Sequence, residues 1–260
     1  MTSTKIRIRP ALSSAAILLT IVTAGCKSTR TSDSTGSIAV PSGPRTEADL
    51  RRDVESYGTR YRANKRDAEA AIGYAWALRG IGQRDQAVAV LEQASILNPK
   101  NKALLGAYGR ALADAGNYKQ ALDVLTRAHT PDQPDWRILS VQGAVLDQMG
   151  RHEDAQDLYA GALRLKPDEP SVLSNLGLSY ALAKDLKKAE ATLRRASARG
   201  AVDPRVRQNL ALVVGLQGRF EEAEGIARAD LPAEEAAANV SYLREMLAQP
   251  NDLKRINRPG

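Results

Sequence analysis

The chain has 260 residues, of which 43% are hydrophobic and only 4% aromatic, and its formal net charge is +7. Basic and acidic residues are interspersed, and no arginine-rich stripe with interleaved aromatic residues occurs, which argues against a nucleic-acid-binding protein. No alternating apolar stretch is long enough to predict a sheet, so the composition favours an all-α fold.

Residues 1–25 have the pattern of an export signal. Lys5, Arg7 and Arg9 precede an apolar stretch over residues 11–24. This stretch is shorter than the roughly 20 residues that span a bilayer, so it favours a cleaved signal peptide over a permanent transmembrane helix. Removal of its three basic residues leaves a formal charge of +4 on the mature chain.

Cys26 is the only cysteine and directly follows this stretch. The run Thr23-Ala24-Gly25-Cys26 resembles the bacterial lipobox, in which the cysteine is acylated and becomes the first residue. Exported proteins that use cysteine structurally carry an even number for disulfides, so we expect a lipid-anchored Cys26 rather than a spare thiol. Lys27 follows, which by resemblance to enterobacterial lipoproteins implies the periplasmic face of the outer membrane.

Residues 26–45 predict a flexible tether, because Ser, Thr, Gly and Pro dominate and few apolar side chains are available for burial. Thr46-Glu47-Ala48-Asp49 then has nearly the pattern of a helix capping box. We expect an N-terminal helix over residues 46–67 that covers the element after it.

A 34-residue period follows, over residues 68–237. Alanine recurs at this spacing at Ala87, Ala121, Ala155, Ala189 and Ala223. A second series, twelve residues earlier, holds the small residues Ala75, Gly109, Gly143, Gly177 and Ala211. A period of this length predicts a stack of helical hairpins, with units that start near 68, 102, 136, 170 and 204.

The expected turn inside each hairpin has its own series, formed by Gly82, Gly116, Gly150 and Gly218. Glycine at this point suits a helix end that needs a left-handed backbone. Lys184 stands at the same phase and breaks the series. At the far end, residues 232–248 predict a helix that caps the last repeat and overlaps it, and residues 249–260 predict a frayed tail.

These repeats resemble the tetratricopeptide repeat, with a small residue eighth and alanine twentieth in the unit. The resemblance covers five units and implies an all-α solenoid of about five hairpins with N- and C-terminal capping helices. Small residues are needed where the paired helices approach closely. Such solenoids present a concave surface lined by the first helix of each hairpin.

Eight residues are candidates for a partner-binding groove by their place in the first helices: Trp76, Arg110, Arg137, Asn175, Leu178, Arg205, Asn209 and Leu212. By resemblance to peptide-binding repeats, Asn175 and Asn209 would hydrogen-bond an extended peptide backbone. Arg205 would add recognition of a carboxylate. Purely structural roles also fit, with the asparagines bonded within the helix pair, Arg205 at a turn, and Trp76 packed between helices.

Residues for catalysis, a cofactor or a metal are not suggested by the sequence, so we expect a protein that is not an enzyme. There are two histidines, His129 and His152. His152-Glu153 begins like a zinc-protease motif, but Gln156 stands where the second histidine is needed. We interpret His152 as an exposed turn residue.

Together with the lipobox and the tether, the runs at residues 103–116, 172–182 and 239–247 look like the TadD family, the repeat-containing lipoproteins of the tight-adherence (Flp) pilus assembly system. This resemblance implies a non-catalytic outer-membrane assembly factor for a type IVb pilus, with a role in adhesion and biofilm formation. The implied partner is the secretin or another pilus component. Two alternatives use similar lipid-anchored repeats: an adaptor for cell-wall hydrolases, and a structural subunit of an outer-membrane protein insertion machine.

Overall fold

A computed structural model describes residues 46–198 and 203–248, which belong to one compact unit beginning at Thr46. The expected signal peptide (1–25), Cys26, the tether (26–45) and the tail (249–260) lie outside the described residues. Within the described ranges the regular elements are α-helices, with a single isolated β-bridge between Thr130 and Gln133. The all-α fold class is therefore confirmed.

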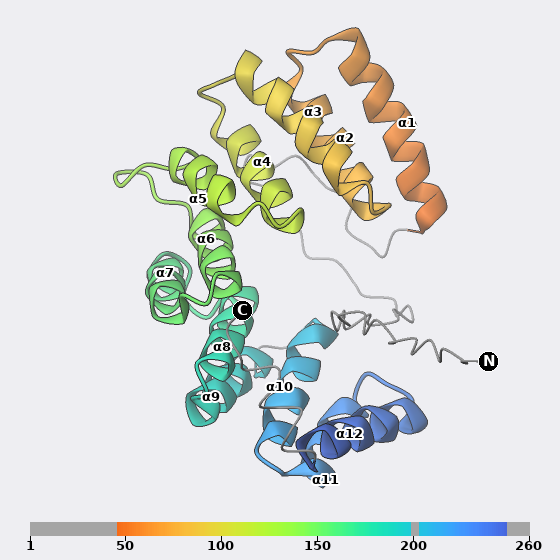
Figure 1. Cartoon of the computed structure of the whole chain (residues 1–260), viewed down its shortest axis with the longest axis vertical. Helices are drawn as coiled ribbons and strands as arrows, with labels where there is room; N and C mark the ends of the chain where they lie inside the picture. Colours follow the sequence, from red (N-terminus) through yellow and green to blue (C-terminus); the bar gives the residue numbers. More distant parts are fainter. Residues whose placement is uncertain (1–45, 199–202, 249–260) are drawn as a thin grey trace, which may run out of the picture. The chain divides into compact units, whose positions relative to one another are not determined.

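Twelve helices occupy the described ranges and follow one another in chain order (Figure 1). A first helix, α1 (Glu47–Ala63), precedes five hairpins, and α12 (Ala233–Ala248) follows them. The hairpins are α2 (Ala68–Gly80) with α3 (Arg84–Leu97), α4 (Lys102–Asp114) with α5 (Tyr118–Arg127), α6 (Trp136–Gln148) with α7 (His152–Leu165), α8 (Pro170–Leu182) with α9 (Leu186–Ser197), and α10 (Pro204–Leu216) with α11 (Phe220–Ala227).

Helix α1 begins with a complete capping box. The Asp49 N–H donates to Thr46 Oγ1 at 3.2 Å, and the Thr46 N–H donates to the Asp49 carboxylate at 3.0 Å. The helix ends at Ala63 rather than at 67, because Asp67 already caps α2 through the Ala70 N–H. Tyr61 is buried and donates to Gln93 Oε1 at 3.0 Å, so α1 covers the first hairpin.

The two helices of a hairpin meet closely where the small residue stands eighth in the unit. A Cβ added at Gly143 would lie 2.7 Å from the Tyr159 ring, and one at Gly177 would lie 2.6 Å from Leu193. Real Cβ atoms do not approach other atoms so closely. Glycine at these positions is therefore required for packing the second helix against the first.

The turn inside each hairpin uses a left-handed residue. Gly82, Gly116, Gly150 and Gly218 have φ between 75° and 82°. Lys184, at the same phase in the fourth hairpin, also adopts a left-handed φ of 66°. The fourth hairpin therefore has the same left-handed turn as the others, although lysine replaces glycine there. A left-handed backbone disfavours a residue with a side chain.

Consecutive hairpins contact one another mainly through the second helix of one and the first helix of the next, and their first helices also contact one another. The backbones of α2, α4, α6, α8 and α10 each approach the next first helix, whereas the backbones of α3, α5, α7, α9 and α11 do not approach one another within the described ranges. The first helices therefore lie on the inner side of the bend between neighbouring hairpins, as in a solenoid. Helix α12 approaches both α10 and α11, where the first helix of another hairpin would lie.

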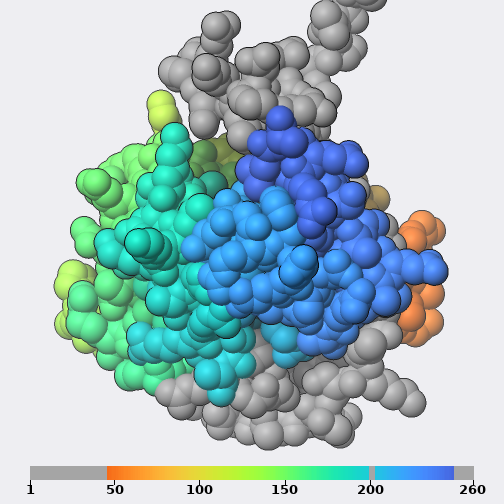
Figure 2. All heavy atoms as spheres, turned by 90° about the horizontal axis from the view of Figure 1, so that it is seen from below, coloured from red at the N-terminus to blue at the C-terminus, as the bar shows by residue number. Residues whose placement is uncertain are grey.

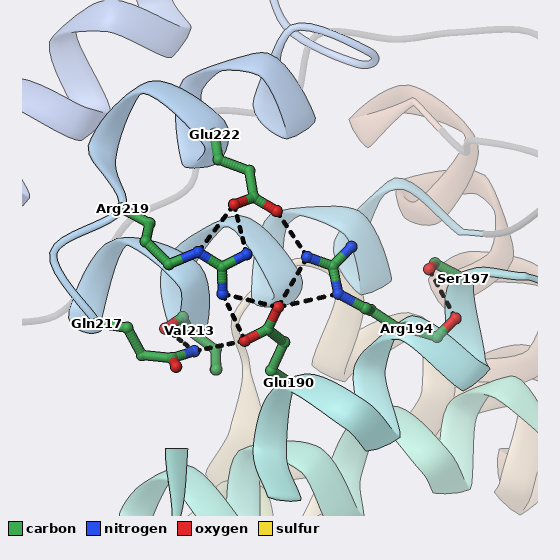
Figure 3. A network of polar contacts seen from close by, with 7 residues as sticks. All are labelled: Glu190, Arg194, Ser197, Val213, Gln217, Arg219 and Glu222. Carbon is green, nitrogen blue, oxygen red and sulfur yellow. Dashed lines mark hydrogen bonds and ion pairs between the residues drawn. The ribbon is translucent and has the colours of Figure 1, made fainter. Parts of the chain in front are cut away.

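The fourth and fifth hairpins are also joined through their second helices (Figure 3). Glu190 of α9 accepts from Arg219 at 2.8 Å and from Gln217 at 2.8 Å. Arg194 bridges Glu190 and Glu222 at 2.7 and 2.6 Å. The side chains of the last hairpin (blue) accordingly pack directly against those of the preceding one (teal) in Figure 2.

Candidate protein-binding face

The first helices α2, α4, α6, α8 and α10 carry a row of side chains at the ninth position of each unit. We call this row and its neighbours on these helices the inner face. The row consists of Trp76, Arg110, Ala144, Leu178 and Leu212. All five residues are half-buried or exposed, and successive first helices contact one another, so the row runs across the stack from hairpin to hairpin.

Asn175 and Asn209 are bonded to the preceding repeat. Asn175 Nδ2 donates to Ser140 Oγ at 3.2 Å, and Asn209 Nδ2 donates to Ser174 Oγ at 3.0 Å. Both serines are buried, so these bonds satisfy polar groups between adjacent first helices. The amide nitrogens therefore have a structural role, while no hydrogen bond to the two side-chain oxygens occurs within the described ranges.

Arg137 and Arg205 each have a local partner. The Arg137 guanidinium lies 4.5 Å from the centre of the Trp136 ring. Arg205 pairs with Asp203, the N-cap of its own helix, with Nε to Oδ2 at 3.0 Å, and its pKa is raised mainly by that hydrogen bond. A carboxylate ligand would have to compete with Asp203 for Arg205.

Arg110 differs from the other half-buried arginines in having no carboxylate partner among the described residues. Three arginines in the described ranges are half-buried, Arg79, Arg110 and Arg207. Arg79 Nε pairs with Asp114 at 2.6 Å, and Arg207 Nε pairs with Asp230 at 2.6 Å. Arg110 has no hydrogen-bond or ion-pair partner among the described residues, and its pKa is lowered by burial and then by the charge of Arg79.

Apolar side chains dominate the C-terminal half of the inner face. Leu178 is half-buried and Leu212 is 38% exposed. Leu182, which the sequence analysis did not select, is 53% exposed and lies one helical turn after Leu178 on α8. Its spacing of four residues from Leu178 was the signal that would have identified it.

Trp76 is half-buried near the N-terminal end of the row and has interaction partners of its own. Arg79, which is not among the residues expected from the sequence, lies three residues further along α2 on the same side of the helix. Aromatic, cationic and aliphatic residues therefore occupy successive parts of one face, a composition suited to a protein ligand rather than to a reaction.

A second polar cluster lies between the third and fourth hairpins. The Asp147 carboxylate accepts from Tyr159 at 3.0 Å and from Ser179 at 2.7 Å, and lies 2.9 Å from His152 Nδ1. Our interpretation of His152 as an exposed turn residue is wrong, because it is the first residue of α7, half-buried against Asp147. Ser179 bonds the carboxylate and not the imidazole, so the cluster is not a nucleophile and base pair.

The described ranges bring no three His, Cys, Asp or Glu side chains together in a group that would hold a metal ion. None of their helices combines the length and the apolar character that crossing a bilayer requires.

Comparison with known proteins places these hairpins in a family. One tetratricopeptide-repeat model matches residues 82–142 and 148–213, and a second matches residues 68–93. No curated protein sequence matches the chain.

Solved structures share the fold at low identity. PilW, described as a widely conserved type IV pilus biogenesis factor, is 18% identical with a TM-score of 0.65, over 74% of this chain and 91% of its own. PilF of Pseudomonas aeruginosa is 17% identical with a TM-score of 0.52, over 77% of this chain and 86% of its own. The Cut9 and Hcn1 hetero-tetramer of the APC/C gives 14% identity and a TM-score of 0.60, over 76% of this chain and 40% of that one. The chain belongs to the tetratricopeptide-repeat family.

Proposed function

We propose that this protein is a non-catalytic, lipid-anchored assembly factor of the tight-adherence pilus that binds the secretin through its inner face and promotes secretin multimerisation or localisation. The observation that carries the proposal is the repeat fold, which aligns with nearly the whole of a type IV pilus biogenesis factor. Repeat proteins of this family bind protein partners and are generally not catalysts.

The expected anchor at Cys26 and the tether over residues 26–45 complete the proposal. Acylation of Cys26 would hold the protein at the outer membrane, and the tether would let the hairpins reach a partner in the same membrane. Confinement to one membrane raises the effective concentration of the two proteins without any added contact.

The inner face supports a binding role because it carries exposed leucines and an arginine without a hydrogen-bond or ion-pair partner among the described residues. Fully satisfied side chains would give a partner little to recognise. Here Leu182 and Leu212 are exposed and Arg110 has no counterion within residues 46–198 and 203–248, so binding would bury apolar surface and pair a charge.

The test is deletion of the gene in the source bacterium, with wild-type and Cys26→Ser copies restored in parallel. Membrane fractions are separated, and the assembled secretin multimer is measured in each fraction. Multimer that is lost or misplaced on deletion, and rescued only by the form that can be acylated, is the expected result. Normal multimer without pili would assign the protein to another assembly step, and normal multimer with normal pili would refute a role in this pilus.

A further inference from the structure

We infer that the inner face binds an extended peptide segment that carries a carboxylate side chain at Arg110 and aliphatic side chains at Leu178, Leu182 and Leu212. This inference rests on the proposed function, because it names the chemistry of the partner at the same face. The expected ligand is a peptide segment of a protein partner, in which an acidic residue and an aliphatic residue stand at a defined separation.

The acidic end of the ligand follows from the charges around Arg110. Two carboxylates, Asp114 and Asp135, lie near enough to act on its guanidinium, as do the cations Arg79 and Arg137. Asp114 pairs with Arg79, Asp135 accepts from the backbone N–H of Arg137 at the start of α6, and the three guanidinium groups outnumber the two carboxylates. One positive charge in this group of five is therefore uncompensated.

A half-buried guanidinium without a partner is costly, because it has lost part of its hydration and gained no ion pair. The other two half-buried arginines of the described ranges both have a carboxylate. An incoming carboxylate would give Arg110 what Arg79 and Arg207 already have. Exposed arginines such as Arg127 keep their hydration, so the same argument does not apply to them.

The aliphatic end of the ligand follows from the C-terminal half of the row. Leu178 and Leu182 lie one turn apart on α8, and Leu212 lies at the matching position on the adjacent α10. No charged residue occurs within α8 (Pro170–Leu182), so this part of the face favours apolar side chains.

The separation of the two ends is set by the helices between them. Arg110 on α4 and Leu178 on α8 are two first helices apart, and packed helices lie roughly 10 Å from one another. The distance is therefore about 20 Å, which an extended chain rising about 3.3 Å per residue covers in about six residues. The ligand should therefore carry its acidic residue about six positions from the aliphatic residue at Leu178 and Leu182, and about nine positions from one at Leu212.

The experiment selects binders from a phage-displayed library of random peptides of about twelve residues, long enough to span both ends. The targets are the full chain purified in detergent, Arg110→Met, and the matched control Arg127→Met. Methionine keeps an apolar stem without the charge. Arg127 is an exposed arginine of the second helix α5 with no ion pair among the described residues.

The expected result is enrichment of Asp or Glu about six positions from Leu, Ile or Val with the wild type and with Arg127→Met, and loss of the acidic preference with Arg110→Met. A selected peptide should bind Arg110→Met about tenfold or more weakly, and its own acidic-to-amide variant should lose as much on the wild type. The two changes together should cost no more than either alone, because they remove one interaction.

Acidic enrichment that survives in Arg110→Met would overturn the inference, and so would the absence of any enriched sequence. The secretin assay separates this failure from failure of the proposed function. Secretin that needs the protein but assembles normally with Arg110→Met leaves the function standing and refutes the inference. Secretin that never needs the protein, with peptide selection as expected, refutes the function and leaves the inference standing.

Discussion

Glu190 joins the fourth and fifth hairpins, and its replacement by glutamine should weaken that junction in a pH-dependent way. Burial raises the pKa of Glu190, but hydrogen bonds from Gln217, Arg194 and Arg219 more than offset this and lower the pKa from 4.5 to about 2. A shift of this size corresponds to at most about 3 kcal/mol. The side chains of Arg194 and Arg219 are 47% and 42% exposed, so screening by solvent reduces the expected loss to about 1 to 2 kcal/mol.

The direction with pH follows from the lowered pKa. Glu190 contributes its stabilisation in full above its unfolded pKa of about 4.5, and the contribution is lost as the pH falls toward about 2, where the folded protein also binds the proton. The difference in unfolding free energy between the wild type and Glu190→Gln should therefore be largest near neutral pH and should close toward about pH 2.

Urea denaturation across this pH range measures the difference, and amide hydrogen exchange locates it. In a repeat protein each hairpin is stabilised by its neighbours, so loss of protection should appear in α10, α11 and α12 before it appears in α2 to α5. Glu153→Gln is the control, because Glu153 is an exposed carboxylate of α7 with no ion pair among the described residues. Equal stability of Glu190→Gln and the wild type at neutral pH, or a difference that does not change with pH, would refute the role given to Glu190.

Two further predictions concern the backbone and the hairpin interface. Lys184→Gly should raise the free energy of unfolding by about 1 kcal/mol, because a left-handed φ of 66° disfavours a side chain and suits glycine. Urea denaturation measures this, and an unchanged or lower urea midpoint would contradict it. Gly143→Ala should lower the free energy of unfolding by about 1 to 3 kcal/mol, seen as a lower melting temperature, because its Cβ would lie 2.7 Å from the Tyr159 ring. Gly161→Ala in α7, whose Cβ would have ordinary contacts at 3.6 Å, should instead stabilise by up to about 1 kcal/mol, and the same sign for both variants would show that the close approach is not the cause.

The fold class could be predicted from the sequence because repeated contacts impose repeated residues. The small residue at Gly143 or Gly177 is needed wherever a first helix meets Leu193 or its counterpart, so the requirement recurs with every hairpin. The left-handed turn recurs in the same way, and even the exception, Lys184, keeps the φ of the series. A period identifies such positions since each one has the same neighbours in every repeat.

The hydrogen-bond partners on the inner face could not be predicted in this way. Asn175 bonds to Ser140 and Asn209 to Ser174, in the preceding repeat, and the choice depends on side-chain conformations that the period does not fix. His152 was misinterpreted for a related reason, because its partner Asp147 lies across a turn at the end of the preceding helix.

Which arginine is available to a carboxylate ligand could not be predicted from the sequence, because contacts between repeats decide it. Carboxylate recognition is expected from the sequence at Arg205, but Asp203 stands two residues before it and pairs with its guanidinium. Arg110 has Asp114 four residues after it, a spacing that ordinarily suggests an ion pair within a helix. Arg79 from the preceding repeat takes that carboxylate instead. Only the contact between repeats reveals which of these arginines has no partner in the part of the chain that the structure describes.

Some residues of the inner face bond adjacent helices and others do not, and this difference decides which variants can test binding. The asparagines hold adjacent first helices together, so Asn175→Ala would disturb the stack and any ligand at once, and a loss of binding could not be assigned to either cause. Arg110 makes no hydrogen bond or ion pair within the described ranges, and its replacement by methionine removes a half-buried charge. If Arg110→Met weakens binding while the hairpins remain as stable as before, or become more so, the loss belongs to the interaction of Arg110 with the ligand and not to a disturbed stack.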